Sequence, residues 1–216
     1  MWVEPVTLVG ERVRLEPLRP EHARGLFAVT EPELFRYTTT SPQRGTLAGF
    51  EAYLRTLGEP PGRCLFAIVT AEHPVGMTAY LEVRPAHRAL EVGLTWVGRL
   101  HQGTRVNPES KYLLLRHAFE SLGAARVQLK TDGRNERSQR AIAKLGAARE
   151  GVLRKYMKMP DGVQRDWILF SITDDDWPRV KARLEARLAQ EDTPAAQEGT
   201  PAAPATQRQS PESSHG

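Results

Sequence analysis

The polar loop Gln102–Asn107 has the clearest chemical potential in the sequence, because it joins a predicted strand directly to a predicted helix. Asn107 and the Pro and Glu that follow it favour the start of a helix. Free backbone amides in such a loop and in the first helical turn point to one spot, where the helix dipole adds about half a positive charge. Gly103 would let a ligand approach the backbone closely. The pattern predicts an anion site, although a polar loop before a helix is common.

A second polar segment, Asn135–Ser138, follows the next predicted strand and opens another predicted helix, which ends at Gly146. Asn135 is typical of a helix N-cap, and Ser138 is typical of its partner in the first turn. Taken alone, the segment is therefore interpreted more simply as a helix start than as a binding site.

Cysteine and histidine chemistry is largely excluded. Cys64 is the single cysteine, so neither an intrachain disulfide nor a cysteine zinc cage can form. It lies in an apolar run, which predicts a buried, inert thiol rather than a nucleophile. We expect no metal site, because neither HxxxH nor HExxH spacing occurs among His22, His73, His87, His101 and His117.

Short apolar and alternating runs predict the strands that must position these segments. The predicted strands are Val13–Leu18, Cys64–Thr70, Val75–Val83, Leu90–Val97 and Val127–Thr131, followed by a hairpin of residues 152–159 and 163–172 around Pro160–Gly162. Apolar periodicity and caps predict helices near residues 23–27, 47–57, 107–122, 135–145 and 174–190. Three successive strands imply an antiparallel meander, and the strand, helix, strand, helix order that follows is a βαβα unit.

The composition of the chain bounds its organisation. Its 216 residues, 40% hydrophobic and 26% charged, suit one or at most two soluble globular domains. No stretch approaches the roughly 18 apolar residues of a spanning helix, and the first residues show no export signal pattern, so we expect a cytoplasmic protein without membrane contact. Residues 191–216 hold four prolines and no aromatic residue, which predicts a disordered Pro/Ala/Ser-rich tail behind a single domain of residues 1–190.

The charge of the chain is placed unevenly. Residues 1–190 carry 29 basic and 22 acidic residues, a formal charge of +7. This balance suits a polyanionic ligand such as nucleic acid, anionic lipid or a phosphorylated cofactor, but composition alone favours a solvated basic surface. We expect no nucleic-acid partner, because the sequence has no interleaved basic and aromatic run and no Cys/His finger.

The order of these elements, with the segments Gln102–Asn107 and Asn135–Ser138 at the starts of two helices, resembles the GNAT acyltransferase superfamily. Within it, the chain looks like the ribosomal-protein N-acetyltransferases of RimJ/RimL type, over about Val6–Thr173. The resemblance implies an α+β (mixed α/β) acyl-CoA N-acyltransferase fold, with a single central, mostly antiparallel twisted sheet of about six to seven strands flanked by helices.

The resemblance also implies acetyl-CoA as the cofactor. In the family a loop of pattern Gln/Arg-x-x-Gly-x-Gly/Ala holds it; Gln102 matches, whereas Arg105 and Asn107 replace the small positions. Arg105 is expected either to contact a phosphate or to be a solvated surface arginine. Within this family pattern, main-chain amides near Trp96 or Val97 donate to the carbonyl. The residues implied to bind the cofactor are Trp96, Val97, Gln102, Gly103, Thr104, Arg105, Val106, Asn107, Asn135 and Ser138.

Three further roles follow from the mechanism that the resemblance implies. An amine attacks a thioester only when neutral, so the transfer needs a proton acceptor and a proton for the sulfur. By resemblance, Glu91 accepts the proton of the amine through water, and Ser138 protonates the sulfur. Tyr156 is a second candidate for the acid, and Asp166 is a candidate for orienting the substrate, both ranked after Ser138.

Each of these residues also has a plainer interpretation. Glu91 could be an exposed strand glutamate, Tyr156 an ordinary strand aromatic, and Asp166 the partner of a neighbouring cation. Strict alternation places Glu91 on the sheet face of Gly93 and Thr95, opposite Val92, Leu94 and Trp96.

The sequence as a whole therefore predicts an acetyl-CoA-dependent N-acetyltransferase that transfers the acetyl group directly to a primary amine in a ternary complex. The acceptor is a protein N-terminus or a small-molecule amine, which would enter between the first two helices and the last hairpin. The alternatives are a catalytically degenerate acyl-CoA-binding regulator and, ranked lower, a basic nucleic-acid-binding module. Trp177 and the final helix could offer a homodimer face.

Overall fold

The computed structural model describes residues 2–42, 45–71 and 73–189. The expected tail of residues 191–216 lies outside these described residues, so the division into a domain and a tail stays a prediction. Among the described residues, no helix is both long and apolar enough to cross a bilayer.

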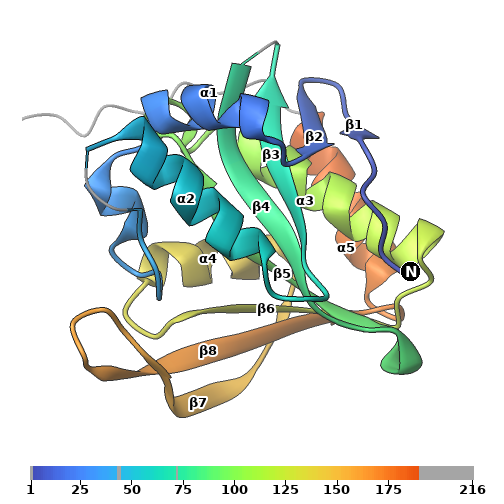
Figure 1. Ribbon diagram of the computed structural model, residues 1–216. Helices are drawn as coiled ribbons and strands as arrows, with labels where there is room; N and C mark the ends of the chain where they lie inside the picture. Colours follow the sequence, from blue (N-terminus) through green and yellow to red (C-terminus); the bar gives the residue numbers. More distant parts are fainter. Residues whose placement is uncertain (1, 43–44, 72, 190–216) are drawn as a thin grey trace, which may run out of the picture.

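One sheet of eight strands forms the centre of the protein, in the order β1-β2-β3-β4-β5-β6-β8-β7 (Figure 1). The strands are β1 Leu8–Val9, β2 Val13–Pro17, β3 Cys64–Thr70, β4 His73–Arg84, β5 Ala89–Val97, β6 Arg126–Asp132, β7 Ala148–Lys158 and β8 Gln164–Thr173. The predicted mixed α+β architecture, the β3-β4-β5 meander and the final hairpin are confirmed. The strand number exceeds the expected six to seven, because the two residues of β1 pair with β2.

Helices cover both faces of the sheet (Figure 1). They are α1 Ala23–Ala28, α2 Leu47–Gly58, α3 Val106–Arg116, α4 Glu136–Leu145 and α5 Trp177–Leu188. One apolar cluster joins α1 and α2 to one face of the sheet, and a larger cluster joins α3, α4 and α5 to the other face. Burial of the apolar side chains in these two clusters is the main favourable contribution to the stability of the fold.

Two helix starts differ from the sequence prediction. α3 begins at Val106 rather than Asn107, because the Val106 amide donates to Thr104 Oγ1 at 3.3 Å and the cap therefore lies before Asn107. α5 begins at Trp177 rather than near Asp174, after a turn in which the Thr173 amide donates to the Asp176 side chain.

Trp177 does not form an exposed dimer face. Its side chain is 6% exposed, stacks on Phe119 with ring centroids 5.2 Å apart, and donates through Nε1 to Glu120. The expectation that Trp177 contributes to a contact surface is therefore wrong, because the ring belongs to the core beneath α5. A homodimer as such stays a prediction.

The strands β5 and β6 run parallel, as a βαβα unit requires, but they pair over a short length. Their residue pairs are Ala89 with Arg126, Leu90 with Val127, and Glu91 with Gln128. Beyond Glu91, β5 remains paired with β4 up to Val97, whereas β6 remains paired with β8 down to Asp132. The two strands therefore part in the middle of the sheet, and we call this feature the parting of β5 and β6.

A β-bulge changes the direction of the side chains along β5. Leu94 has a left-handed φ of 49°, and Leu94 and Thr95 together oppose the single residue Thr78 of β4. Trp96 and Leu94 consequently pack in the cluster with α1 and α2, whereas Thr95 accepts a hydrogen bond from Lys111 of α3 on the other face. The prediction that Thr95 shares the face of Glu91 is wrong, because strict alternation ends at the bulge.

Candidate active site

The loop after β5 presents unpaired backbone donors. Gly103 has a φ of 80°, in the left-handed region that favours glycine. Within the part of the chain that the structure describes, the amides of Gly103, Thr104 and Arg105 have no hydrogen-bond partner. They directly precede the 11-residue helix α3, whose dipole adds positive potential at the same point. Consecutive free amides at a helix start suit a phosphate or diphosphate group.

Gln102 connects this loop to the second polar segment. Its Nε2 donates to the Val97 carbonyl at 2.9 Å, and its Oε1 accepts from Arg137 Nη1 at 2.5 Å. Arg137 lies in the first turn of α4, between Asn135 and Ser138. The structure thus brings together the two segments that the sequence singled out, at the open end of the parting of β5 and β6.

Arg105 and Asn107, the two residues that depart from the expected loop pattern, do not block the free amides of the loop. Arg105 turns towards the β1–β2 turn, where its Nη2 forms an ion pair with Glu11 Oε2 at 2.6 Å and its side chain is 13% exposed. The hydrogen bond from Arg105 lowers the pKa of Glu11 below its ordinary value. Asn107 Oδ1 is buried and has no partner among the described residues. The loop backbone therefore fits a diphosphate group, because neither side chain is hydrogen-bonded to the free amides.

Asn135 and Ser138 form the N-terminal cap of α4. Asn135 Oδ1 accepts from the Ser138 amide at 3.0 Å, and Gly146, with a φ of 99°, ends the helix. The capping interpretation of these residues is confirmed. Their contact with a cofactor stays a prediction, as do the roles of Trp96, Val97 and Val106, whose side chains are buried.

Glu91 lies where β5 and β6 part, as the last residue of β5 that pairs with β6. The residue is 5% exposed, so it is not the exposed strand glutamate of the plainer interpretation. Its Oε2 accepts from Lys130 Nζ at 2.9 Å and from Gln128 Nε2 at 3.1 Å. Burial raises the pKa of Glu91 above its ordinary value, and Lys130 opposes the rise.

Lys130 is a member of the site that the sequence analysis missed. Its Nζ also forms an ion pair with Glu82 Oε1 at 2.5 Å and donates to the Tyr156 hydroxyl at 2.9 Å. Burial lowers the pKa of Lys130, but Glu91 and Glu82 outweigh burial and hold it above its ordinary value. The spacing of Gln128 and Lys130 on one strand was the available signal, because alternation places both on one face. Their contact with Glu91 depends on the strand register.

Tyr156 and Asp166 lie on the final hairpin. The Tyr156 ring is 41% exposed, lies under Lys130 Nζ at 4.9 Å, and is tilted against Trp167. Asp166 Oδ1 accepts from the Lys155 amide at 2.7 Å, at a point where Lys155 has a φ of 49°. Asp166 therefore stabilises an irregular part of the β7 backbone, and its predicted role towards the substrate stays a prediction.

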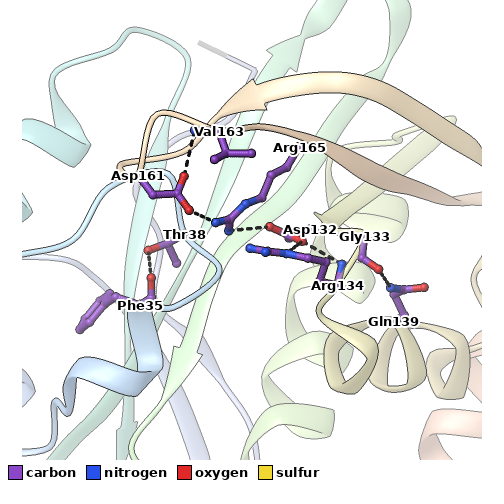
Figure 2. A network of polar contacts seen from close by, with 9 residues as sticks. All are labelled: Phe35, Thr38, Asp132, Gly133, Arg134, Gln139, Asp161, Val163 and Arg165. Carbon is purple, nitrogen blue, oxygen red and sulfur yellow. Dashed lines mark hydrogen bonds and ion pairs between the residues drawn. The ribbon is translucent and has the colours of Figure 1, made fainter.

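A charged network fastens the β7–β8 turn to the end of β6 (Figure 2). Arg165 Nη1 lies 3.4 Å from Asp132 Oδ2, and its Nη2 forms an ion pair with Asp161 in the turn. Asp132 also accepts from the Arg134 amide at 2.8 Å. Asp132 is buried and paired, so this network fixes the hairpin that carries Tyr156 relative to β6.

A buried lysine lies on the opposite face of β5. Lys111 of α3 donates to Thr95 Oγ1, which lies 2.9 Å from Thr78 Oγ1. Burial lowers the pKa of Lys111 to about 7. Cys64 is buried as expected, and burial raises the pKa of its thiol to about 11, which suits an inert residue.

Comparison with known proteins connects this geometry to a family. Residues 12–148 match the profile described as acetyltransferase (GNAT) domain. The solved structure of a T. thermophilus protein assigned to the acetyltransferases is 46% identical in sequence and has a TM-score of 0.83. The match covers 87% of this chain and 100% of that chain. No curated protein sequence matches the chain.

Two further solved structures share the fold. A GCN5-related N-acetyltransferase from Brucella melitensis is 28% identical, with a TM-score of 0.82 and 88% of each chain covered. RimJ of Mycobacterium smegmatis, solved in complex with CoA-disulfide, is 22% identical, with a TM-score of 0.69, and the match covers 85% of this chain and 95% of that one.

Proposed function

We propose that this chain, which belongs to the GNAT acetyltransferase family, transfers an acetyl group directly from acetyl-CoA to a primary amine within a ternary complex. The observation that carries the proposal is the buried Glu91 carboxylate, located where β5 and β6 part. The loop with free amides and the start of α4 meet at the open end of the same parting.

The residues of the loop and of α4 would hold the cofactor, which supplies the acetyl group as a thioester. The amides of Gly103, Thr104 and Arg105 would donate to the diphosphate, with Val106 and Asn107 continuing the same helix start. Gln102, Asn135 and Ser138 would line the pantetheine side. Arg105 would add its charge beside the loop while it remains paired with Glu11.

The chain supplies a proton acceptor and two candidate proton donors. Glu91 Oε2 would accept the proton of the amine through a water molecule, because the amine must be neutral to attack. A main-chain amide at Trp96 or Val97 would stabilise the negative charge that develops on the carbonyl oxygen. Ser138 is supported as the acid by its motif, and Tyr156 is supported by its hydrogen bond from Lys130.

The acceptor is proposed to be an N-terminal amine of a protein, as in enzymes of RimJ/RimL type, or a small-molecule amine. Asp166 is proposed to orient the acceptor from the final hairpin.

Release of free thiol from acetyl-CoA in the presence of an amine panel tests the proposal. The panel contains peptides with free N-termini, matched N-acetylated peptides, polyamines and aromatic amines. We expect thiol release with at least one free amine and none with the acetylated peptides. Cofactor binding without turnover across the whole panel would contradict an enzyme and support an acyl-CoA-binding regulator.

A further inference from the structure

The Lys130 ammonium lies between the candidate base and a candidate acid. Its Nζ is 2.9 Å from Glu91 Oε2 and 2.9 Å from the Tyr156 hydroxyl oxygen. Lys130 is two residues beyond Gln128, the last residue of β6 that pairs with β5, so its ammonium stands at the parting. One cation therefore contacts both groups at the point where the proposed chemistry takes place.

Fold stability alone gives a weak reason for this arrangement. The side chains of Lys130 and Glu91 are 5% and 7% exposed, so both charges have lost most of their hydration. A buried ion pair typically contributes no more stability than apolar side chains of similar volume, because desolvation offsets the attraction. Glu82, the second carboxylate on the same ammonium, has a φ of 45°, a conformation that costs free energy for a residue other than glycine.

We propose that Lys130 is a positioning residue of the acyl transfer, whose ammonium holds the Glu91 carboxylate ionised and directs Tyr156, rather than Ser138, as the proton donor. This inference rests on the proposed function and specifies which residues of the site work together.

The direction of the hydrogen bond explains how Lys130 would direct Tyr156. An ammonium has three hydrogens and no acceptor, so Nζ donates to the phenol oxygen and leaves the phenol hydrogen free for another acceptor. The positive charge also stabilises the phenolate that remains after the proton has left. The hydroxyl of Ser138 has no comparable cation in its described contacts.

The protons balance around this cation. The bond between the amine nitrogen and the acetyl carbon forms, and the carbon–sulfur bond of the thioester breaks. Glu91 gains at Oε2 the proton that the amine loses, and Tyr156 gives its hydroxyl proton to the departing sulfur. The phenolate of the exposed Tyr156 then regains a proton from solvent water, and the Glu91 carboxyl loses its proton to solvent water, while Lys130 keeps its charge throughout. Glu91, Tyr156 and Lys130 thus end the turnover in their starting protonation states, and this proton exchange requires no other reagent.

The charged and titratable neighbours of Glu91 come from three other strands. Glu82 and Arg84 lie on β4, Glu91 itself on β5, Lys130 on β6 and Tyr156 on β7. Gln128 Nε2 donates to both Glu82 and Glu91, and its Oε1 lies 3.5 Å from Arg84. Among the described residues, Lys130 is the cation in direct contact with Glu91, so its removal leaves Glu91 close to the second carboxylate, Glu82, while Arg84 contacts Gln128 rather than Glu91.

A carbon-13 NMR titration of the Glu91 carboxyl, together with pH–rate profiles, tests the proposal in Lys130→Met and Lys130→Arg. The Glu91 resonance is assigned by its loss in Glu91→Gln. In Lys130→Met the carboxyl midpoint and the acid limb of the rate profile should both move up by about one to three pH units. In Lys130→Arg both should stay within about half a pH unit, because the charge is kept.

The controls distinguish a positioning role of Lys130 from an effect of its replacement on folding and from failure of the proposed function. Lys158→Met removes another lysine charge, at an exposed site on β7, and should change neither the midpoint nor the profile. Thermal unfolding checks that Lys130→Met remains folded. A carboxyl midpoint unmoved in folded Lys130→Met would overturn the inference, even if the rate falls. If the wild-type chain neither binds acetyl-CoA nor acetylates any amine, the proposed function fails first.

Discussion

Glu91 and Gln128 form the last residue pair between β5 and β6, and Gln128 Nε2 donates to Glu91 Oε2 at 3.1 Å. The pair marks the point at which the sheet opens, and it fixes the Glu91 carboxylate there. A buried carboxylate with a raised pKa at the end of a short parallel ladder is suited to accepting a proton.

Replacement of this carboxylate should reduce turnover more than cofactor binding. Glu91→Gln keeps the shape of the side chain and the hydrogen bond from Gln128, but it cannot accept a proton. We expect kcat to fall by about 10²- to 10³-fold, with the calorimetric Kd for acetyl-CoA nearly unchanged. Turnover equal to that of the wild type would remove Glu91 as the base.

Arg105 should act mainly on the cofactor. Arg105→Ala removes a charge beside the loop amides and frees Glu11, so we expect the affinity for acetyl-CoA to fall by about 10-fold. Glu11→Gln is the matched variant, because it breaks the same ion pair and keeps the arginine. Weaker binding of acetyl-CoA in both variants would show that Arg105 stabilises the loop conformation through its ion pair with Glu11. Weaker binding in Arg105→Ala alone would indicate a contact between Arg105 and a phosphate. Unchanged affinity in both would contradict either role.

Two variants, each of which removes a single hydroxyl group, distinguish the two candidate acids. Tyr156→Phe removes the hydroxyl that Lys130 binds and keeps the ring against Trp167, and Ser138→Ala keeps the cap, because the Ser138 amide is the donor to Asn135. We expect Tyr156→Phe to lower kcat by about 10- to 100-fold and Ser138→Ala to change it less. The reverse order in steady-state assays would return the role to Ser138.

Lys111 should make the stability of the fold depend on pH. Its pKa is lowered from 10.5 to about 7 by burial, so between these values the unfolded chain binds more protons than the folded protein. The destabilisation is complete below pH 7 and fades as the pH rises towards 10.5. Lys111→Met should therefore increase the free energy of unfolding at pH 6 to 7 by a few kcal/mol, with little gain near pH 10.

Urea unfolding of Lys111→Met and of the wild type at both pH values measures this difference, in which all other titrating groups cancel. An equal gain at both pH values would mean that better apolar packing, rather than the removal of a buried charge, explains the effect.

Much of the fold followed from local patterns in the sequence. Alternating and apolar runs identified the β3-β4-β5 meander, the turn Pro160–Gly162 predicted the last hairpin, and Asn135 and Gly146 marked the ends of α4. These features depend on residues close in sequence, so propensity and capping were sufficient.

The finer geometry of the site depends on contacts that local patterns do not contain. Arg105 meets Glu11 across 94 positions, and Gln128 meets Glu91 across 37. The bulge at Leu94 reversed the alternation of β5, and no residue type there signals a left-handed conformation. The role of Lys130 was missed for the same reason, because it depends on how far β5 and β6 pair.

The most direct test of the account is a calorimetric titration of acetyl-CoA into the purified chain, since every step above requires that cofactor. We expect saturable binding in the micromolar range that Glu91→Gln retains and Arg105→Ala weakens. No detectable binding at millimolar acetyl-CoA would contradict the account, because the loop from Gln102 to Asn107 would then not be a cofactor site.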